Sequence, residues 1–207
     1  MIKAVIFDMD GVLIDAREWH YEALNKALRL FGVEISRYEH LVTFDGLPTK
    51  KKLHMLSMEN RLPYGLHQFI NDLKQDYTME IVNASCKPVF QHEYALSKLK
   101  GNGYRLAVCS NSVRNTIEVM MQRAGLTEYL DFFLSNEDVK NSKPDPEMYT
   151  TAINKLGLQP AECLIVEDNE NGIKAATASG AHVYRVGSPA DVTLHAVMAK
   201  LNELNHA

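Results

Sequence analysis

The sequence of 207 residues has few cysteines, no long uninterrupted hydrophobic run and no excess of basic charge. The three cysteines are Cys86, Cys109 and Cys163, and their spacing matches no metal-binding pattern. Cys109 and Cys163 lie in strand-like segments, where a cysteine usually acts as a small buried apolar residue. We therefore expect no cysteine-based metal site or redox centre.

The early apolar stretch is interrupted by Asp8, so the sequence predicts neither a signal peptide nor a membrane-spanning helix. The formal net charge is −4, and the short run Lys50-Lys51-Lys52 is typical of a solvated helix face rather than of a basic stripe. Nucleic acids and anionic membranes are consequently not expected as partners. The expected location is cytoplasmic.

Strand-like and helix-like segments alternate over most of the chain. The strand-like segments are 2–7, 105–109, 132–134, 163–166 and 182–186. The helix-like segments are 113–123, 147–156, 172–179 and a last one that can start at Ser188-Pro189. This alternation predicts an α/β fold, with a mostly parallel sheet covered by helices on both faces.

Residues 16–85 interrupt the alternation, because they contain no convincing strand. Apolar residues recur there at helical spacing, as in Tyr21, Leu24, Leu28 and Phe31. We interpret the segment as an all-helical insertion, with residues 1–15 and 86–207 forming the main domain. Extra helices packed on a single core are the alternative.

Two carboxylates follow the first predicted strand directly, in Phe7-Asp8-Met9-Asp10-Gly11. Ligands of open α/β sheets bind outside the carboxyl ends of the strands. Asp8 and Asp10 can therefore face one pocket, bind a hard cation, and divide the roles of nucleophile and proton-transfer group. A strand followed by an Asp-rich turn is the alternative interpretation.

Three further polar clusters follow strand-like segments or their loops. Ser110 precedes a predicted helix and can bind a phosphate oxygen, although a helix-capping serine has the same pattern. Lys143 precedes a proline and can neutralise an anionic substrate, although surface lysines are common in such loops. Glu167 and Asp168 can complete a magnesium site with Asp8, or they can belong to a helix cap.

Together these clusters resemble the haloacid dehalogenase superfamily, which consists mainly of phosphatases and phosphotransferases. The matching motifs are Asp8-Met9-Asp10-Gly11, Ser110-Asn111-Ser112, Lys143-Pro144 and Glu167-Asp168. The resemblance extends from about residue 2 to residue 189. It implies a Rossmann-like three-layer α/β/α core with a small helical cap inserted after the first strand, and it favours a monomer.

The resemblance also implies roles for the motif residues. Asp8 would be the nucleophile that forms an aspartyl-phosphate, and Asp10 the general acid and base. Ser110, Asn111 and Lys143 would bind the transferring phosphoryl group. Mg²⁺ would bridge Asp8, the Asp10 backbone carbonyl and Asp168. Glu167 would match an additional carboxylate of the metal site.

The residues around the motifs narrow the range of expected reactions. The dehalogenases of this superfamily lack an aspartate at the position that matches Asp10, because they need no acid to protonate an alkoxide leaving group. A dehalogenase is therefore not expected. Glu167-Asp168 with Gly172 resembles the branch that contains β-phosphoglucomutase and sugar-phosphate phosphatases. In that branch His20 matches a histidine near Asp10, and Lys74 matches a substrate-contacting lysine.

The expected activity is that of a Mg²⁺-dependent phosphatase acting on a small phosphorylated metabolite, such as a sugar phosphate. β-Phosphoglucomutases carry an arginine in the insertion to clamp a second phosphate, where this sequence has Thr49 and Lys50. Lysine cannot reproduce the bidentate grip of arginine, which favours hydrolysis. A β-phosphoglucomutase-like phosphotransferase is the alternative. A non-catalytic binding protein is disfavoured, because every motif residue is present.

Overall fold

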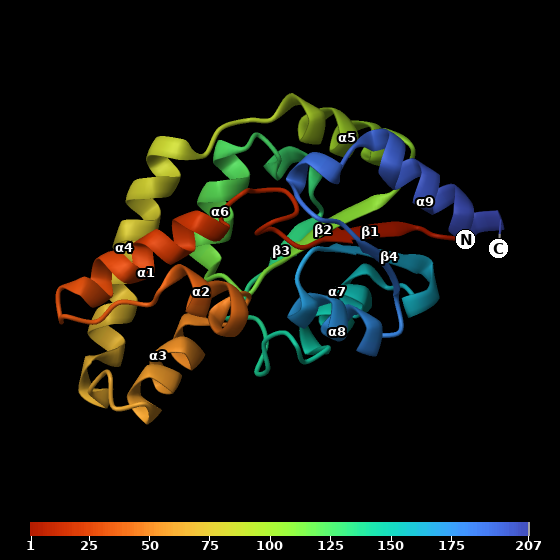
Figure 1. Ribbon diagram of the computed structural model, residues 1–207. Helices are drawn as coiled ribbons and strands as arrows, with labels where there is room; N and C mark the ends of the chain where they lie inside the picture. Colours follow the sequence, from red (N-terminus) through yellow and green to blue (C-terminus); the bar gives the residue numbers. More distant parts are fainter. Residues whose placement is uncertain (207) are drawn as a thin grey trace. The chain divides into compact units, whose positions relative to one another are not determined.

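The computed structural model describes residues 1–206. The chain divides into two compact units (Figure 1). The first contains Met1–Asp15 together with the chain from Lys87 onward, and the second is Ala16–Cys86. We refer to them as the sheet unit and the helical unit.

The sheet unit is built on five parallel strands in the order β3-β2-β1-β4-β5. The strands are β1 (Ala4–Phe7), β2 (Arg105–Cys109), β3 (Phe132–Leu134), β4 (Cys163–Glu167) and β5 (His182–Arg185). All four residues of the central strand β1 are buried, because the sheet is covered on both faces. The predicted α/β fold with a parallel sheet is confirmed.

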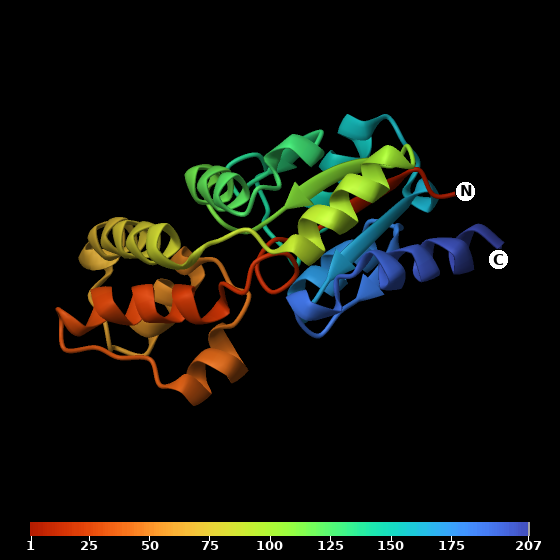
Figure 2. The same ribbon diagram turned by 90° about the horizontal axis from the view of Figure 1, so that it is seen from above.

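Helices cover both faces of this sheet (Figures 1 and 2). They are α5 (Phe90–Gly101), α6 (Arg114–Arg123), α7 (Glu147–Leu156), α8 (Glu170–Ala178) and α9 (Leu194–His206). Figure 1 shows α7 and α8 on one face and α5 and α9 on the other. The chain moves across the sheet in one direction from β1 to β3 and in the opposite direction from β3 to β5. Because connections between parallel strands are right-handed, the helices that connect the strands of these two halves lie on opposite faces.

Two helices differ from the sequence-based expectation. Helix α5 was not predicted; it has no side-chain N-cap, and its buried stripe is short, with Ala95, Leu96 and Leu99 as its apolar members. Helix α9 begins at Leu194 rather than at Ser188-Pro189. The reason is a capped 3-10 turn at Pro189–Asp191, in which the Asp191 carboxylate accepts a hydrogen bond from the Ser188 backbone N–H.

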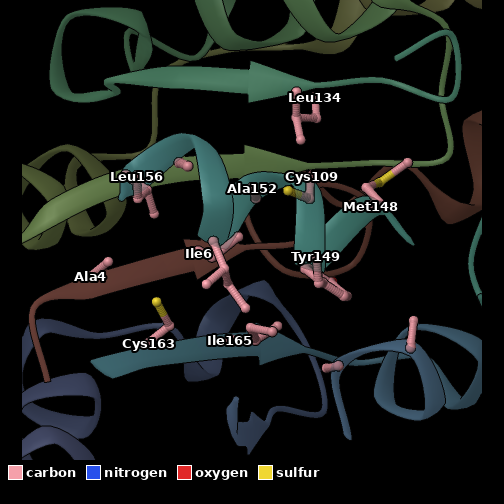
Figure 3. Packing of buried hydrophobic residues seen from close by; sticks show 14 residues of the cluster. Ala4, Ile6, Cys109, Leu134, Met148, Tyr149, Ala152, Leu156, Cys163 and Ile165 are labelled. Atoms are coloured by element: carbon pink, nitrogen blue, oxygen red, sulfur yellow. The ribbon is translucent and has the colours of Figure 1, made fainter. Parts of the chain in front are cut away.

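One hydrophobic core lies between the sheet and helices α7 and α8 (Figure 3). Ile6 and Ile165 from neighbouring strands pack there with Tyr149 and Ala152 of α7. Full burial of a large apolar side chain contributes about 1.5–3 kcal/mol, so this layer holds the strands in place. Cys109 and Cys163 are free, buried thiols, as predicted.

The helical unit contains α1 (Arg17–Arg29), α2 (Arg37–Glu39), α3 (Thr49–Met58) and α4 (His67–Ser85). A π-helical turn at His40–Phe44 and a 3-10 turn at Tyr64–Leu66 complete it. Its own core includes Leu24, Leu28, Leu53 and Ile70. No helix within the described part of the chain is long and apolar enough to cross a membrane.

Candidate active site

The register of the sheet brings three chemically active segments to one edge. Phe7 in β1 pairs with Val108 in β2 on one side and with Val166 in β4 on the other. The residues that follow these positions therefore lie side by side at the carboxyl ends of the three strands. They are Asp8, Cys109-Ser110 and Glu167-Asp168.

Three of the predicted carboxylates form a cluster at this edge. Each of Asp8, Glu167 and Asp168 offers one oxygen, and these oxygens all lie within 4.8 Å of one another. Asp8 and Glu167 are buried. Burial raises the pKa of Asp8 well above its usual range, and the negative charge of Glu167 raises it further. The cluster accumulates negative charge in a place with little water, so it favours a cation.

Lys143 supplies one positive charge to the cluster. Its Nζ donates hydrogen bonds to Asp8 Oδ1 at 2.5 Å, to Glu167 Oε1 at 2.8 Å and to the Cys109 carbonyl at 2.8 Å. Burial lowers the pKa of Lys143, but the charges of Asp8 and Glu167 outweigh that effect and the pKa is raised. The ammonium is thus held charged, with all three donors used.

Asn111 holds the backbone of Lys143 through two hydrogen bonds. Its Oδ1 accepts from the Lys143 N–H at 3.1 Å, and its Nδ2 donates to the Lys143 carbonyl at 3.3 Å. Asn136 Nδ2 in turn donates to the Asn111 carbonyl at 2.9 Å. The predicted binding residue Asn111 therefore also connects the β2 and Lys143 loops.

Asp10 is held by two serine hydroxyls. Ser110 Oγ donates to Asp10 Oδ2 at 3.3 Å, and Ser112 Oγ donates to the same oxygen at 3.1 Å. Ser110 Oγ also accepts from the Ser112 N–H at 3.0 Å. Ser112 belongs to the Ser110-Asn111-Ser112 motif, but the sequence assigns it no role of its own; the one sequence signal for its contact with Asp10 is the Ser-x-Ser spacing after a strand.

Two glycines make room for the carboxylates. Gly11 has a φ of +87°, and a Cβ atom there would overlap the Asp168 carboxylate. A Cβ atom on Gly172 would overlap the Glu167 carboxylate. Any side chain at either position would displace the acidic cluster, so close approach of the backbone is part of the site.

The acidic cluster fits Mg²⁺. This ion prefers oxygen ligands and is usually bound through one or two carboxylates. Asp8, Glu167 and Asp168 with Lys143 carry a net charge of two minus when all are ionised, which one divalent cation would balance. Asp8 and Asp168 can hold such an ion with Glu167 as a further carboxylate beside them, and Lys143 bonds to both Asp8 and Glu167.

Tyr149 is a member of the site that sequence reasoning missed. It is fully buried in α7, and its hydroxyl donates to Glu167 Oε1 at 2.6 Å. In the sequence, Tyr149 belongs to the apolar face of a helix, and nothing in that pattern distinguishes it from an ordinary core aromatic.

The two predicted residues of the helical unit lie together. Lys74 on α4 is buried, and its Nζ lies 3.2 Å from His20 Nδ1 on α1. Thr49 and Lys50 begin helix α3. The helical unit thus contains a buried ammonium beside an imidazole, a pair of polar groups that could bind a polar ligand.

The sequence matches the haloacid dehalogenase-like hydrolase family over residues 5–186. A haloacid dehalogenase-like hydrolase domain-containing protein of Arabidopsis thaliana is 30% identical over an alignment of 210 positions. The alignment covers 86% of this chain and 66% of that protein. A phosphorylated carbohydrates phosphatase of Thermotoga maritima is 28% identical over 182 residues, which cover 86% of this chain and 82% of that protein.

The fold is also found among solved structures. The β-phosphoglucomutase of Clostridium difficile superposes with a TM-score of 0.85 at 23% identity, covering 100% of both chains. At this identity the likeness concerns the fold. The family match, in contrast, covers most of the chain and includes the strand-end residues from Asp8 to Asp168 described above. The chain therefore belongs to the haloacid dehalogenase-like hydrolases.

Proposed function

We propose that this protein is a Mg²⁺-dependent phosphatase that hydrolyses a small phosphomonoester, in particular a sugar phosphate, through an aspartyl-phosphate on Asp8. The observation that carries the proposal is the Lys143 ammonium bonded to Asp8 within an acidic cluster. Phosphoryl transfer depends mainly on positioning and on charge neutralisation, and this arrangement offers both. The name of the Thermotoga relative supports the substrate class.

In the first step, an Asp8 carboxylate oxygen forms a bond to phosphorus while the bond from phosphorus to the leaving oxygen breaks. Asp10 donates a proton to that oxygen, so the product leaves as an alcohol. In the second step, Asp10 takes a proton from water, and the water oxygen attacks phosphorus. Inorganic phosphate leaves and Asp8 is restored.

The surrounding residues hold the reacting groups. Ser110 and Ser112 orient Asp10 through its Oδ2. Lys143 and Ser110 would bind the phosphoryl oxygens, and Asn111 keeps the Lys143 backbone in place. Asp8, Asp168 and the Asp10 carbonyl would hold Mg²⁺, with Glu167 as a nearby carboxylate. When bound, the metal neutralises charge on the phosphoryl group.

We further propose that the helical unit is a cap and that His20 and Lys74 contact the substrate. Lys74 is buried and lies next to His20, so both groups have a fixed orientation. A fixed ammonium suits recognition of hydroxyl or anionic groups on a sugar. On this proposal, Lys74→Ala raises KM for the preferred sugar phosphate more than it lowers kcat.

A β-phosphoglucomutase-like phosphotransferase is the second candidate, since the fold resembles that enzyme. A mutase must hold a bisphosphorylated intermediate while it turns over. Thr49 and Lys50 offer no guanidinium at the start of α3 for that purpose. Hydrolysis is therefore the preferred proposal.

The deciding experiment measures phosphate release from a panel of sugar phosphates, with and without Mg²⁺. Wild type is compared with Asp8→Asn and with the control Asp72→Asn, which changes an exposed carboxylate in the helical unit. Mg²⁺-dependent release that only Asp8→Asn abolishes is expected. The panel includes β-glucose 1-phosphate with a trace of glucose 1,6-bisphosphate. Its conversion to glucose 6-phosphate with little free phosphate would instead establish the mutase.

A further inference from the structure

Tyr149 is among the largest fully buried side chains of the protein, yet it carries a hydroxyl that a phenylalanine would lack. A buried tyrosine hydroxyl needs a hydrogen-bond partner. Here the partner is Glu167 Oε1, at 2.6 Å. Because Glu167 lies in the acidic cluster, the hydroxyl connects the core to the candidate active site.

Both carboxylate oxygens of Glu167 accept hydrogen bonds. Oε1 accepts from Tyr149 and, at 2.8 Å, from Lys143 Nζ. Oε2 accepts from the backbone N–H groups of Asp168 at 3.1 Å and Asn169 at 3.3 Å. Each oxygen thus receives two donors, and the carboxylate has a fixed position.

The Lys143 ammonium is divided between two carboxylates. It bonds to Asp8 Oδ1 and to Glu167 Oε1, and its third proton is used by the Cys109 carbonyl. Its Nζ also lies 4.7 Å from the centre of the Tyr149 ring. The stronger its attraction to Glu167, the further the ammonium is drawn away from Asp8, where the phosphoryl group would be transferred.

We propose that Tyr149 is a positioning residue whose hydroxyl shares the charge of Glu167 Oε1, so that the Lys143 ammonium stays directed at Asp8. Without the hydroxyl, Lys143 is the only donor to Oε1 and moves toward Glu167. The inference rests on the proposed phosphatase function. Tyr149 does not touch the reacting atoms itself, and it acts through Glu167 and Lys143.

The test compares wild type with Tyr149→Phe, which keeps the ring, its packing and its contact with Lys143. Tyr21→Phe is the control, because it removes a tyrosine hydroxyl that donates to the Ile35 carbonyl in the helical unit. Four quantities are measured in saturating Mg²⁺. They are kcat and KM for phosphate release, and the affinities for vanadate and for inorganic phosphate by calorimetry.

Lys143 acts most strongly on charge that develops in the transition state, so kcat of Tyr149→Phe is expected to fall about tenfold while KM changes less than about twofold. Vanadate, which mimics the five-coordinate phosphorus, is expected to bind about tenfold more weakly, whereas inorganic phosphate changes little. Tyr21→Phe leaves all four quantities near the wild-type values.

A double-mutant cycle shows whether Tyr149 acts through Glu167. In a Glu167→Gln background, adding Tyr149→Phe is expected to change kcat and vanadate affinity less than about twofold, because the carboxylate is already gone. Equal effects in both backgrounds would overturn the proposal. A fully active Tyr149→Phe protein would overturn the proposal as well, since the hydroxyl would then have no role in the reaction. A Tyr149→Phe protein that does not fold would also overturn it, since the hydroxyl would then serve only stability.

The same experiment separates this inference from the proposed function. If wild type binds vanadate with Mg²⁺ but releases no phosphate, the phosphatase proposal fails, and the vanadate comparison still decides the role of Tyr149. If wild type neither binds vanadate nor releases phosphate, both proposals are wrong.

Discussion

Gly11 and Asp168 lie so close together that a Cβ atom on Gly11 would overlap the Asp168 carboxylate. Gly11 follows strand β1 and Asp168 follows strand β4, so the two residues are far apart in the sequence. The contact places a carboxylate of the candidate metal site directly against the turn that carries Asp8 and Asp10. It makes the absence of a side chain at residue 11 a requirement of the site.

Gly11→Ala is therefore expected to weaken Mg²⁺ binding by at least about tenfold, as disturbance of the groups that orient metal ligands typically does. Calorimetric titration with Mg²⁺ measures the effect. Gly157→Ala is the matched control, because Gly157 also has a positive φ, of +71°, but no atom lies within 4 Å of its Cβ position. Both changes cost about 1–2 kcal/mol of backbone strain, and only Gly11→Ala should affect the metal. Equal Mg²⁺ affinities in the two variants would contradict the geometry.

Lys143→Met is expected to destabilise the metal-free protein by about 3–5 kcal/mol, because it removes the positive partner of two buried acidic groups, Asp8 and Glu167. Added Mg²⁺ should recover part of this loss by supplying the missing positive charge. Urea unfolding with and without Mg²⁺ measures both effects. Lys140→Met is the control, since Lys140 is exposed in the same loop. If Lys143→Met and Lys140→Met lost the same amount of unfolding free energy, the buried ion pairs would not be responsible for the loss.

Asp8→Asn is expected to stabilise the metal-free protein at neutral pH. Burial, then the charge of Glu167, raises the pKa of Asp8 above its unfolded value, so between these two pKa values the folded state binds more protons than the unfolded state. The contribution of Asp8 to stability therefore falls as the pH rises through the folded pKa. The asparagine of Asp8→Asn does not titrate, so its contribution to stability does not change with pH.

The difference between Asp8→Asn and wild type in unfolding free energy should thus grow as the pH rises from about 4, the ordinary pKa of an aspartate, toward the raised pKa of the folded state, and it should shrink when Mg²⁺ is added. Urea unfolding across this range measures it, with Asp72→Asn as an exposed carboxylate control. A difference that stays constant with pH would refute the charge-based explanation.

The buried cysteines Cys109 and Cys163 should be chemically inert in the folded protein. Burial raises the pKa of Cys109 to about 12 and that of Cys163 to about 11. Since the thiolate is the reactive form, iodoacetamide at pH 8 should label neither residue until urea unfolds the chain. Mass spectrometry of labelled peptides reports each site. Rapid labelling of native Cys109 would mean that the strand β2 end is open to solvent.

Much of the fold follows from local sequence patterns. Short apolar runs predicted all five strands, because a parallel strand covered on both faces must be apolar throughout. The polar residues that end these runs identified Asp8, Ser110, Glu167 and Asp168, since ligands of such sheets bind at the strand ends. Helix α5 was missed because its apolar stripe is short and no capping side chain marks its start.

The sequence by itself determined which residue types stand at the ends of the strands and, through the family motifs, which family the chain resembles. Only the tertiary structure decided the partners: Ser112 on Asp10, Asn111 on the backbone of Lys143, and Tyr149 on Glu167. A pattern of apolar and polar residues encodes burial and the face of an element. It does not encode the direction of a single hydroxyl toward a residue on another element, which depends on how the sheet and its helices pack.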